Sequence, residues 1–153
     1  MLHLTGSVNK KMLLQFIEAI QCYENISVVR ITSHGGDPDI ALAIAGLIQQ
    51  YELDTEIYGQ CYSAAVLIFA AGKRRRVQKW SWIMVHEGSE AVDGNASSIK
   101  AHAKHMERSE QHWNAIMQEL TGTEAKVWEK LNERDTYLNA EECLKLNLAT
   151  EIF

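Results

Sequence analysis

Three side chains could together carry out acyl transfer: those of Ser63, His86 and Asp135. A serine hydroxyl is a weak nucleophile until a base takes its proton, and a carboxylate is needed to orient that base. Ser63 follows a short apolar strand and begins an apolar helix, where unpaired helix N–H groups would stabilise an oxyanion. Serine is also a preferred helix N-cap, and capping is the more common explanation for this residue considered alone.

The other candidates also have ordinary structural explanations. His86 ends an apolar strand, a place where histidines are often hydrogen-bonded structural residues. Asp135 lies between two expected helices, where a carboxylate commonly caps a helix or joins a surface ion pair. Gly35 and Gly36 follow another strand, so they form either a tight turn or a close backbone approach to a substrate.

The pattern along the chain predicts strands that alternate with helices, which indicates an α/β fold with mostly parallel pairing. The expected strands cover about 2–4, 26–32, 55–58, 81–86 and 148–153, with a short one at Val77. The expected helices cover about 10–20, 38–48, 63–71, 99–120 and 123–132, and a last one is capped at 139–142. Ligands gather at the carboxyl ends of parallel strands, and the loops at 33–36, 59–63 and after His86 all fall there.

Composition narrows the class of protein. The 153 residues are 46% hydrophobic and 23% charged, which is typical of one globular domain. The net charge of -5 argues against nucleic acid as the main partner. Three cysteines without paired spacing predict reduced thiols and a cytoplasmic location. No stretch approaches the roughly 20 apolar residues that span a bilayer, and no signal peptide is visible, so no membrane association is expected.

Three histidines on one expected helix, at His102, His105 and His112, raise the question of a metal site. No carboxylate or cysteine completes a set of ligands with them, and the chain contains no CxxC motif. We therefore expect neither a metal nor another cofactor.

Four motifs occur in the order found in the Clp protease proteolytic subunit (ClpP) family, and the resemblance extends from Leu2 to Phe153. The motifs are ITSHGG at 31–36, GQCYSA at 59–64, MVH at 84–86 and ERD at 133–135. The resemblance implies an α/β fold of the ClpP/crotonase-like kind, built from repeated β-β-α units with a protruding handle helix. It also implies one peptidase domain over 1–153, with the handle region at about 87–120.

The resemblance implies a role for each candidate residue. Ser63 would attack the peptide carbonyl, and His86 would act first as general base and then as general acid. Asp135 would hold the imidazole of His86. The backbone N–H groups of Gly35 and Ala64 would form the oxyanion hole.

Substrate and assembly also follow from the resemblance. The peptide would bind as an added strand beside the segments after Gly36 and after His86, with Gly36, Asp37 and Ser89 as substrate-binding residues. The resemblance implies an ATP-dependent-type serine endopeptidase that hydrolyses peptides or unfolded proteins inside a chamber. That chamber would be formed by a homo-oligomer of two stacked rings, a tetradecamer in this family.

Three of the departures from the family bear on the expected function. His34 stands where the family usually has proline, whose ring presets the backbone, so we expect a looser oxyanion strand. Glu87 directly follows His86 and is expected to favour basic side chains in the substrate. The family's N-terminal pore segment does not precede the first core strand here, so an AAA+ unfoldase stays a possible partner and its standard docking is left open.

Two other functions stay open at this point. The first is a catalytically weak ClpP-like scaffold subunit that joins and modulates rings of a full-length peptidase. The second is an acyl-CoA enzyme, because the crotonase fold is related and also uses paired backbone N–H groups on an oxyanion. An acyl-CoA enzyme would not need Ser63, His86 and Asp135 together, so it ranks last.

Overall fold

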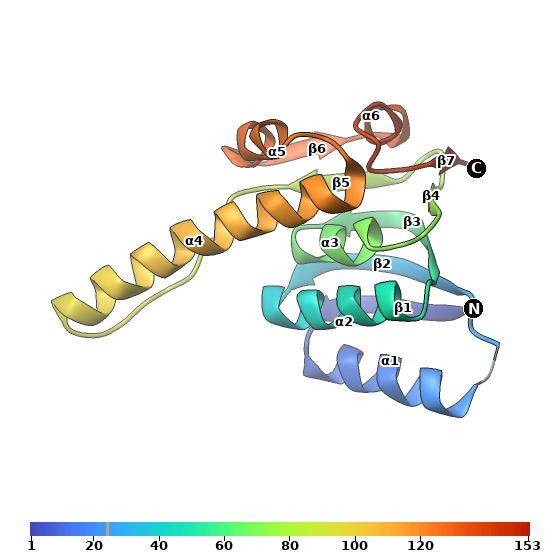
Figure 1. Ribbon diagram of the computed structural model, residues 1–153, viewed down its shortest axis with the longest axis horizontal. Helices are drawn as coiled ribbons and strands as arrows, with labels where there is room; N and C mark the ends of the chain where they lie inside the picture. The colour runs from blue at the N-terminus through green and yellow to red at the C-terminus, as the bar shows by residue number, and fades with distance from the viewer. Residues whose placement is uncertain (24) are drawn as a thin grey trace.

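A computed structural model describes residues 1–23 and 25–153, and it contains one mixed sheet with helices packed against it (Figure 1). The strands are β1 (Leu2–Val8), β2 (Val28–Gly36), β3 (Asp54–Tyr62), β4 (Arg75–Val77), β5 (Trp82–Val85), β6 (Thr136–Leu138) and β7 (Glu151–Ile152). The helices are α1 (Lys10–Cys22), α2 (Pro38–Gln50), α3 (Ala64–Ala70), α4 (Ala96–Thr121), α5 (Ala125–Asn132) and α6 (Ala140–Lys145).

The sheet is parallel except at one pair of strands. Its main path runs β1-β2-β3-β4-β7, and β5 leaves this path by pairing with β3. The short β6 then pairs antiparallel with β5. This arrangement confirms the expected α/β class with mostly parallel strands.

The first three strands, β1, β2 and β3, all run further than the sequence predicts. The break expected at Gly35 and Gly36 is wrong, because both glycines continue β2 and pair with Ser7 and Val8 of β1. The pairing of β1 with β2 continues to Val8 and Gly36 because its register shifts between Thr5 and Ser7. A bulge at this point lets the two strands remain paired up to the edge where a ligand would bind.

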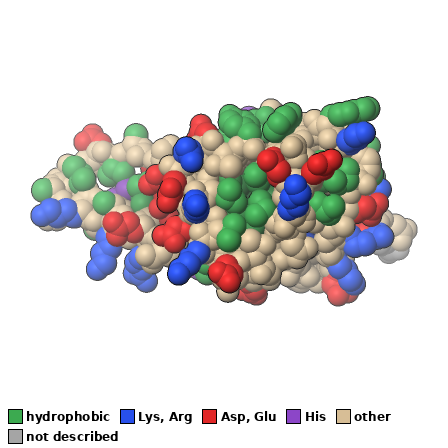
Figure 2. Space-filling view, turned by 90° about the horizontal axis from the view of Figure 1, so that it is seen from above, with side chains coloured by type: hydrophobic (Ala, Val, Ile, Leu, Met, Phe, Trp, Pro, Cys, Tyr) green, Lys and Arg blue, Asp and Glu red, His purple; other side chains and the backbone are tan. Residues whose placement is uncertain are grey.

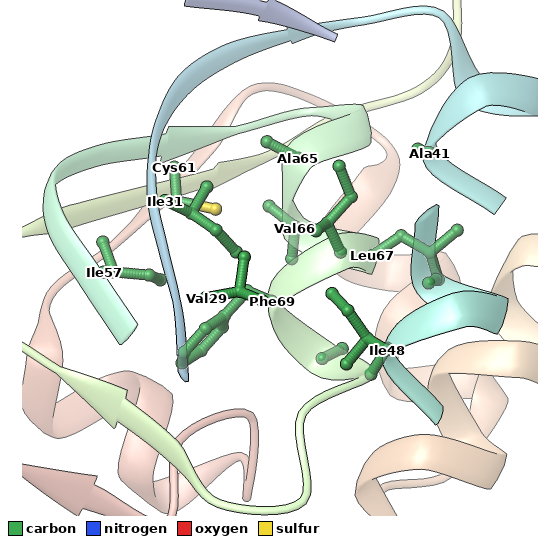
Figure 3. Packing of buried hydrophobic residues seen from close by; sticks show 14 of the residues in the cluster. Val29, Ile31, Ala41, Ile48, Ile57, Cys61, Ala65, Val66, Leu67 and Phe69 are labelled. Carbon is green, nitrogen blue, oxygen red and sulfur yellow. The ribbon is translucent and has the colours of Figure 1, made fainter. Parts of the chain in front are cut away.

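The core includes the layer between the sheet and the helices α1 to α3, and Met117, Trp128 and Cys143 extend it to the later helices. The seven residues of α3 are all buried, as expected for a helix that is apolar on every side. Figure 3 shows Val66 and Phe69 of this helix beside Val29 and Ile31 of β2. The rigid packing of α3 on the sheet holds the residue that precedes it, Ser63, in a defined place.

The helices α1 to α3 cover one face of the sheet, and aromatic side chains stay exposed on the other face. Tyr58, Trp82 and Tyr137 are 38%, 48% and 52% exposed. Parallel sheets are usually covered on both faces, so an uncovered aromatic face is typical of a surface that meets another protein.

Helix α4 extends away from the rest of the molecule (Figure 1). It begins at Ala96, earlier than expected, because the side chain of Asn95 accepts a hydrogen bond from the Ser98 N–H and caps it. It ends at Gly122, whose φ of 76° is the left-handed conformation that commonly closes a helix. Figure 2 shows charged side chains of both signs along this arm and hydrophobic ones gathered over the body of the molecule.

Within residues 1–23 and 25–153, the structure contains no helix that combines the length and the apolar character needed to cross a bilayer.

Candidate active site

Ser63 lies at the junction between β3 and α3 and has an unusual backbone. Its φ of 54° and ψ of -128° are strained for a residue with a side chain. The Ser63 N–H donates to the carbonyl of Met84 at 2.7 Å, which anchors the junction on β5. The hydroxyl makes no capping hydrogen bond to α3, so the capping explanation for Ser63 is wrong.

The Ser63 hydroxyl instead contacts His86. Its Oγ lies 2.8 Å from Nε2 of His86, within hydrogen-bond distance. The two residues meet because β5 pairs in parallel with β3, with Tyr62 opposite Met84, so both chains leave the sheet at the same edge. A hydroxyl donating to a neutral imidazole nitrogen is the arrangement that activates a serine.

Asp135 lies on the far side of the imidazole. Its Oδ1 is 3.4 Å from Nδ1 of His86, which is longer than the usual distance of a charge-assisted hydrogen bond. The carboxylate is brought there because β6 pairs antiparallel with β5, with Thr136 opposite Val85. The Asp135 side chain is 64% exposed, against 29% for the side chain of His86, so water reaches the Asp135 carboxylate.

Gly35 approaches Ser63 closely. A Cβ built on Gly35 would lie 2.7 Å from the carbonyl oxygen of Tyr62 and 2.8 Å from Cβ of Ser63. The φ of Gly35 is 94°, so both its backbone conformation and the space around it require glycine. The same Cβ would lie 3.2 Å from the N–H nitrogen of Ala64, which occupies the first position of α3. An N–H at that position has no carbonyl partner within its helix and is available to a ligand.

The Gly35 N–H already has a partner in this structure, which sequence reasoning missed. It donates to Oγ of Ser33 at 3.1 Å, and that hydroxyl donates to the carbonyl of Gly6 at 2.6 Å. A serine two residues before a glycine often makes such a local bond, so the signal was present in the sequence.

His34 also bonds across the same two strands, because its Nε2 lies 3.1 Å from Oγ of Ser7. This contact links β2 to β1 at the position where the family usually has proline.

The three expected peptide-binding residues lie in different surroundings. Gly36 pairs with Val8, and the Asp37 carboxylate caps α2 by accepting from the Asp39 and Ile40 N–H groups. Ser89 is exposed, in the segment between β5 and α4. The pairing of β2 with β3 ends at Ser33 and Cys61, so beyond that point the β3-facing edge of β2 pairs with no strand in the described part of the chain.

The segment after His86 is acidic and lies against α4. Partial burial and the nearby charge of Glu87 raise the pKa of Glu110, an effect that a hydrogen bond from the Gly88 backbone opposes. Further along, Oε2 of Glu90 lies 3.0 Å from Nε2 of His102. His102 therefore faces a carboxylate, and the described part of the chain contains no cluster of three or more side chains suited to a metal ion.

Comparison with known proteins identifies the family. The sequence profile of the Clp protease family matches residues 3–153. The chain is also 29% identical to the ATP-dependent Clp protease proteolytic subunit 2 of Treponema denticola, over 97% of this chain and 79% of that protein. The chain therefore belongs to the Clp protease family and is a peptidase of the ClpP type.

Proposed function

We propose that this protein is a serine endopeptidase in which Ser63 is the nucleophile, His86 the general base and Asp135 the residue that orients the base. The observation that carries the proposal is the 2.8 Å contact between Ser63 Oγ and His86 Nε2. The strained backbone of Ser63 supports it, because such strain is typical of residues held in place for chemistry.

The reaction follows from this arrangement. As Ser63 Oγ attacks the scissile carbonyl, His86 Nε2 takes the hydroxyl proton and the carbonyl oxygen becomes an oxyanion. His86 then donates that proton to the leaving amine, the C–N bond breaks, and the acyl group stays on Ser63. Water attacks the ester with His86 again as base, which releases the carboxylic acid and restores the serine.

The N–H groups of Gly35 and Ala64 are proposed to bind the oxyanion. Their closeness supports the assignment, since the Gly35 Cβ position is 3.2 Å from the Ala64 nitrogen. The Gly35 N–H would have to leave Oγ of Ser33 when substrate binds. A charged oxyanion is a stronger acceptor than a neutral hydroxyl, so this exchange is favourable in the transition state.

The peptide is proposed to bind as a strand between the free edge of β2 and the segment after His86, with Gly36, Asp37 and Ser89 beside it. Backbone pairing would give affinity for peptides and unfolded chains with little sequence preference. The carboxylates of Glu87 and Glu110 lie along this segment and would favour basic side chains in the substrate.

The chain is proposed to act as one peptidase domain in a homo-oligomer of two stacked rings that encloses a chamber. The exposed aromatic face at Tyr58, Trp82 and Tyr137 is suited to contacts within a ring, and the protruding α4 to contacts between rings. We place the assembly in the cytoplasm, because the cysteines form no disulfide among the described residues. An AAA+ unfoldase as a partner stays a separate hypothesis.

A fluorophosphonate probe tests the nucleophile. We expect it to label the intact protein at Ser63, and to label neither Ser63→Ala nor His86→Ala at a comparable rate. Ser97→Ala, which removes an exposed hydroxyl from α4, is the matched control and should be labelled like the wild type. Equal labelling of the wild type and Ser63→Ala would rule the proposal out.

A second function, a catalytically weak scaffold in rings of a full-length peptidase, is favoured by the 3.4 Å separation between Asp135 and His86. The native mass of this protein, measured alone and mixed with such a peptidase, distinguishes the endopeptidase from the scaffold. A stable homo-oligomer that cleaves peptides in size-separated fractions would exclude the scaffold function.

A further inference from the structure

We propose that Asn132, held by Asn114, is a positioning residue that places Asp135 against His86. This inference rests on the proposed function. It names the contact between α4 and α5 as the feature that fixes the position of Asp135, the third residue of the proposed triad. Asp135 needs such help, because its side chain is mostly exposed and its contact with His86 is long. An exposed carboxylate on a loop has many rotamers and backbone positions available, and orientation of a reacting group requires that they be restricted.

The loop that carries Asp135 is short and is anchored at both ends. Residues 133–135 connect the last residue of α5, Asn132, to the first residue of β6, Thr136. Thr136 pairs with Val85, the residue that precedes His86, so the β6 end of the loop is anchored to the same strand as the base. The Thr136 hydroxyl also donates to the carbonyls of Leu131 at 2.7 Å and Arg134 at 3.2 Å, which closes the loop on itself.

The other end of the loop is anchored to α4. Nδ2 of Asn132 donates to Oδ1 of Asn114 at 3.0 Å. Asn114 is only 8% exposed, so this is a polar contact within the packed interface of the two helices. Oδ1 of Asn132 is itself buried and has no hydrogen-bond partner among residues 1–23 and 25–153. The bond to Asn114 is therefore the directional contact that orients the Asn132 side chain.

Apolar packing alone would not supply this orientation. The indole rings of Trp113, directly before Asn114 on α4, and Trp128, one turn before Asn132 on α5, meet edge to face with 6.2 Å between their centroids. That contact holds α5 on α4, but apolar attraction is largely non-directional and tolerates small sliding. A buried hydrogen bond is sensitive to such sliding, because its partners lose most of their interaction when misaligned. The Asn114–Asn132 bond thus sets the register of α5 at the end next to Asp135.

The test uses Asn132→Leu and Asn114→Leu, which keep the branched shape of the side chain and remove the bond, in the wild-type and Asp135→Asn backgrounds. We expect each substitution to lower kcat about 10- to 100-fold while KM stays nearly constant, because misplacement of a catalytic group by about 1 Å has effects of this size. The double variant should lose no more than either single one. In the Asp135→Asn background neither substitution should lower kcat further, because they act through Asp135.

Thr121→Val is the matched control, because it removes a buried hydroxyl of α4 that donates to the Met117 carbonyl and makes no bond to Asn114 or Asn132. It should lower thermal stability without lowering kcat. If Asn132→Leu does not fold, Asn132→Ser replaces it, since serine is too short to reach Asn114. Wild-type kcat in either single variant, or a loss that persists in the Asp135→Asn background, would overturn the inference. An active wild type with an inactive Ser63→Ala variant shows that the proposed function itself still holds in that case.

Discussion

Nε2 of His86 lies 2.8 Å from Oγ of Ser63, although 23 residues separate them in the sequence. The contact exists because β3 and β5 are parallel neighbours and because the Ser63 N–H donates to the carbonyl of Met84. One backbone hydrogen bond therefore fixes Ser63 on the strand that His86 directly follows. Ser63 and His86 each directly follow a paired strand, whereas Asp135 lies on the loop before β6.

Replacement of Asp135 by asparagine should lower kcat by at least about 100-fold, toward the roughly 10⁴-fold loss known for buried triads. An amide in this place can stabilise the wrong tautomer of His86, and it cannot stabilise the imidazolium that forms. We expect a loss of kcat closer to about 100-fold than to about 10⁴-fold, because the Asp135 side chain is 64% exposed. Steady-state cleavage of a fluorogenic peptide measures the loss, and an unchanged kcat would show that Asp135 does not orient the base.

Gly35→Ala should abolish peptidase activity and reduce stability. The new Cβ would lie under 3.0 Å from both the Tyr62 carbonyl oxygen and the Ser63 Cβ, and the φ of 94° is unfavourable for alanine. Gly46→Ala is the matched control, because Gly46 lies within α2 with open space around its Cβ position. That control should keep full activity and gain up to about 1 kcal/mol of stability from helix propensity. Equal peptidase activity of Gly35→Ala and Gly46→Ala would contradict the close contact of Gly35 with Tyr62 and Ser63.

Glu110→Gln should raise thermal stability at neutral pH. Partial burial and the charge of Glu87 raise the pKa of Glu110 above its ordinary value of 4.5, so the folded protein disfavours the charged form. A raised acid pKa means that the native state binds the proton more tightly than the unfolded chain, so stability falls as pH rises through this window. The gain from glutamine should be largest above the raised pKa and vanish below about pH 4. Its amide oxygen can still accept from the Gly88 N–H.

Melting curves from pH 4 to pH 8 measure this effect, with Glu119→Gln as the control for charge removal from an exposed site on the same helix. If Glu110→Gln raised the melting temperature equally at every pH, the raised pKa of Glu110 would not be the cause.

One thiol should react quickly in the native protein and two should react only on unfolding. Burial raises the pKa of Cys143 to about 12 and that of Cys61 well above its ordinary value, and both thiols are inaccessible. Cys22 is exposed at the end of α1 and should account for the fast reaction. Counting modified thiols by mass spectrometry, with and without denaturant, checks this, and Cys22→Ser should remove the fast phase. Rapid modification of Cys143 in the folded protein would show that α6 opens readily.

Local structure was predictable where the determining contacts are near in sequence. The β-branched run around Val29 and Ile31 forms β2, and the capping box of Asn139 and Glu142 forms at the start of α6 as expected. The break that the sequence predicts at Gly35 and Gly36 does not form, because pairing with β1 keeps both glycines in β2 and joins residues about 28 positions apart. Helix α4 begins three residues before the start that the sequence pattern predicts at Ile99, because Asn95 caps it.

The sequence by itself determined the α/β class, the place of Ser63 between a strand and an apolar helix, and the choice of His86 and Asp135 as candidates. Tertiary structure alone decided that Ser63 bonds to His86 and does not cap its helix, that Gly35 lies against Ser63, and that Asn114 reaches Asn132. The physical reason is that capping and periodicity act within a few residues along the chain. The site depends on strand pairing and helix packing, which join segments far apart in sequence.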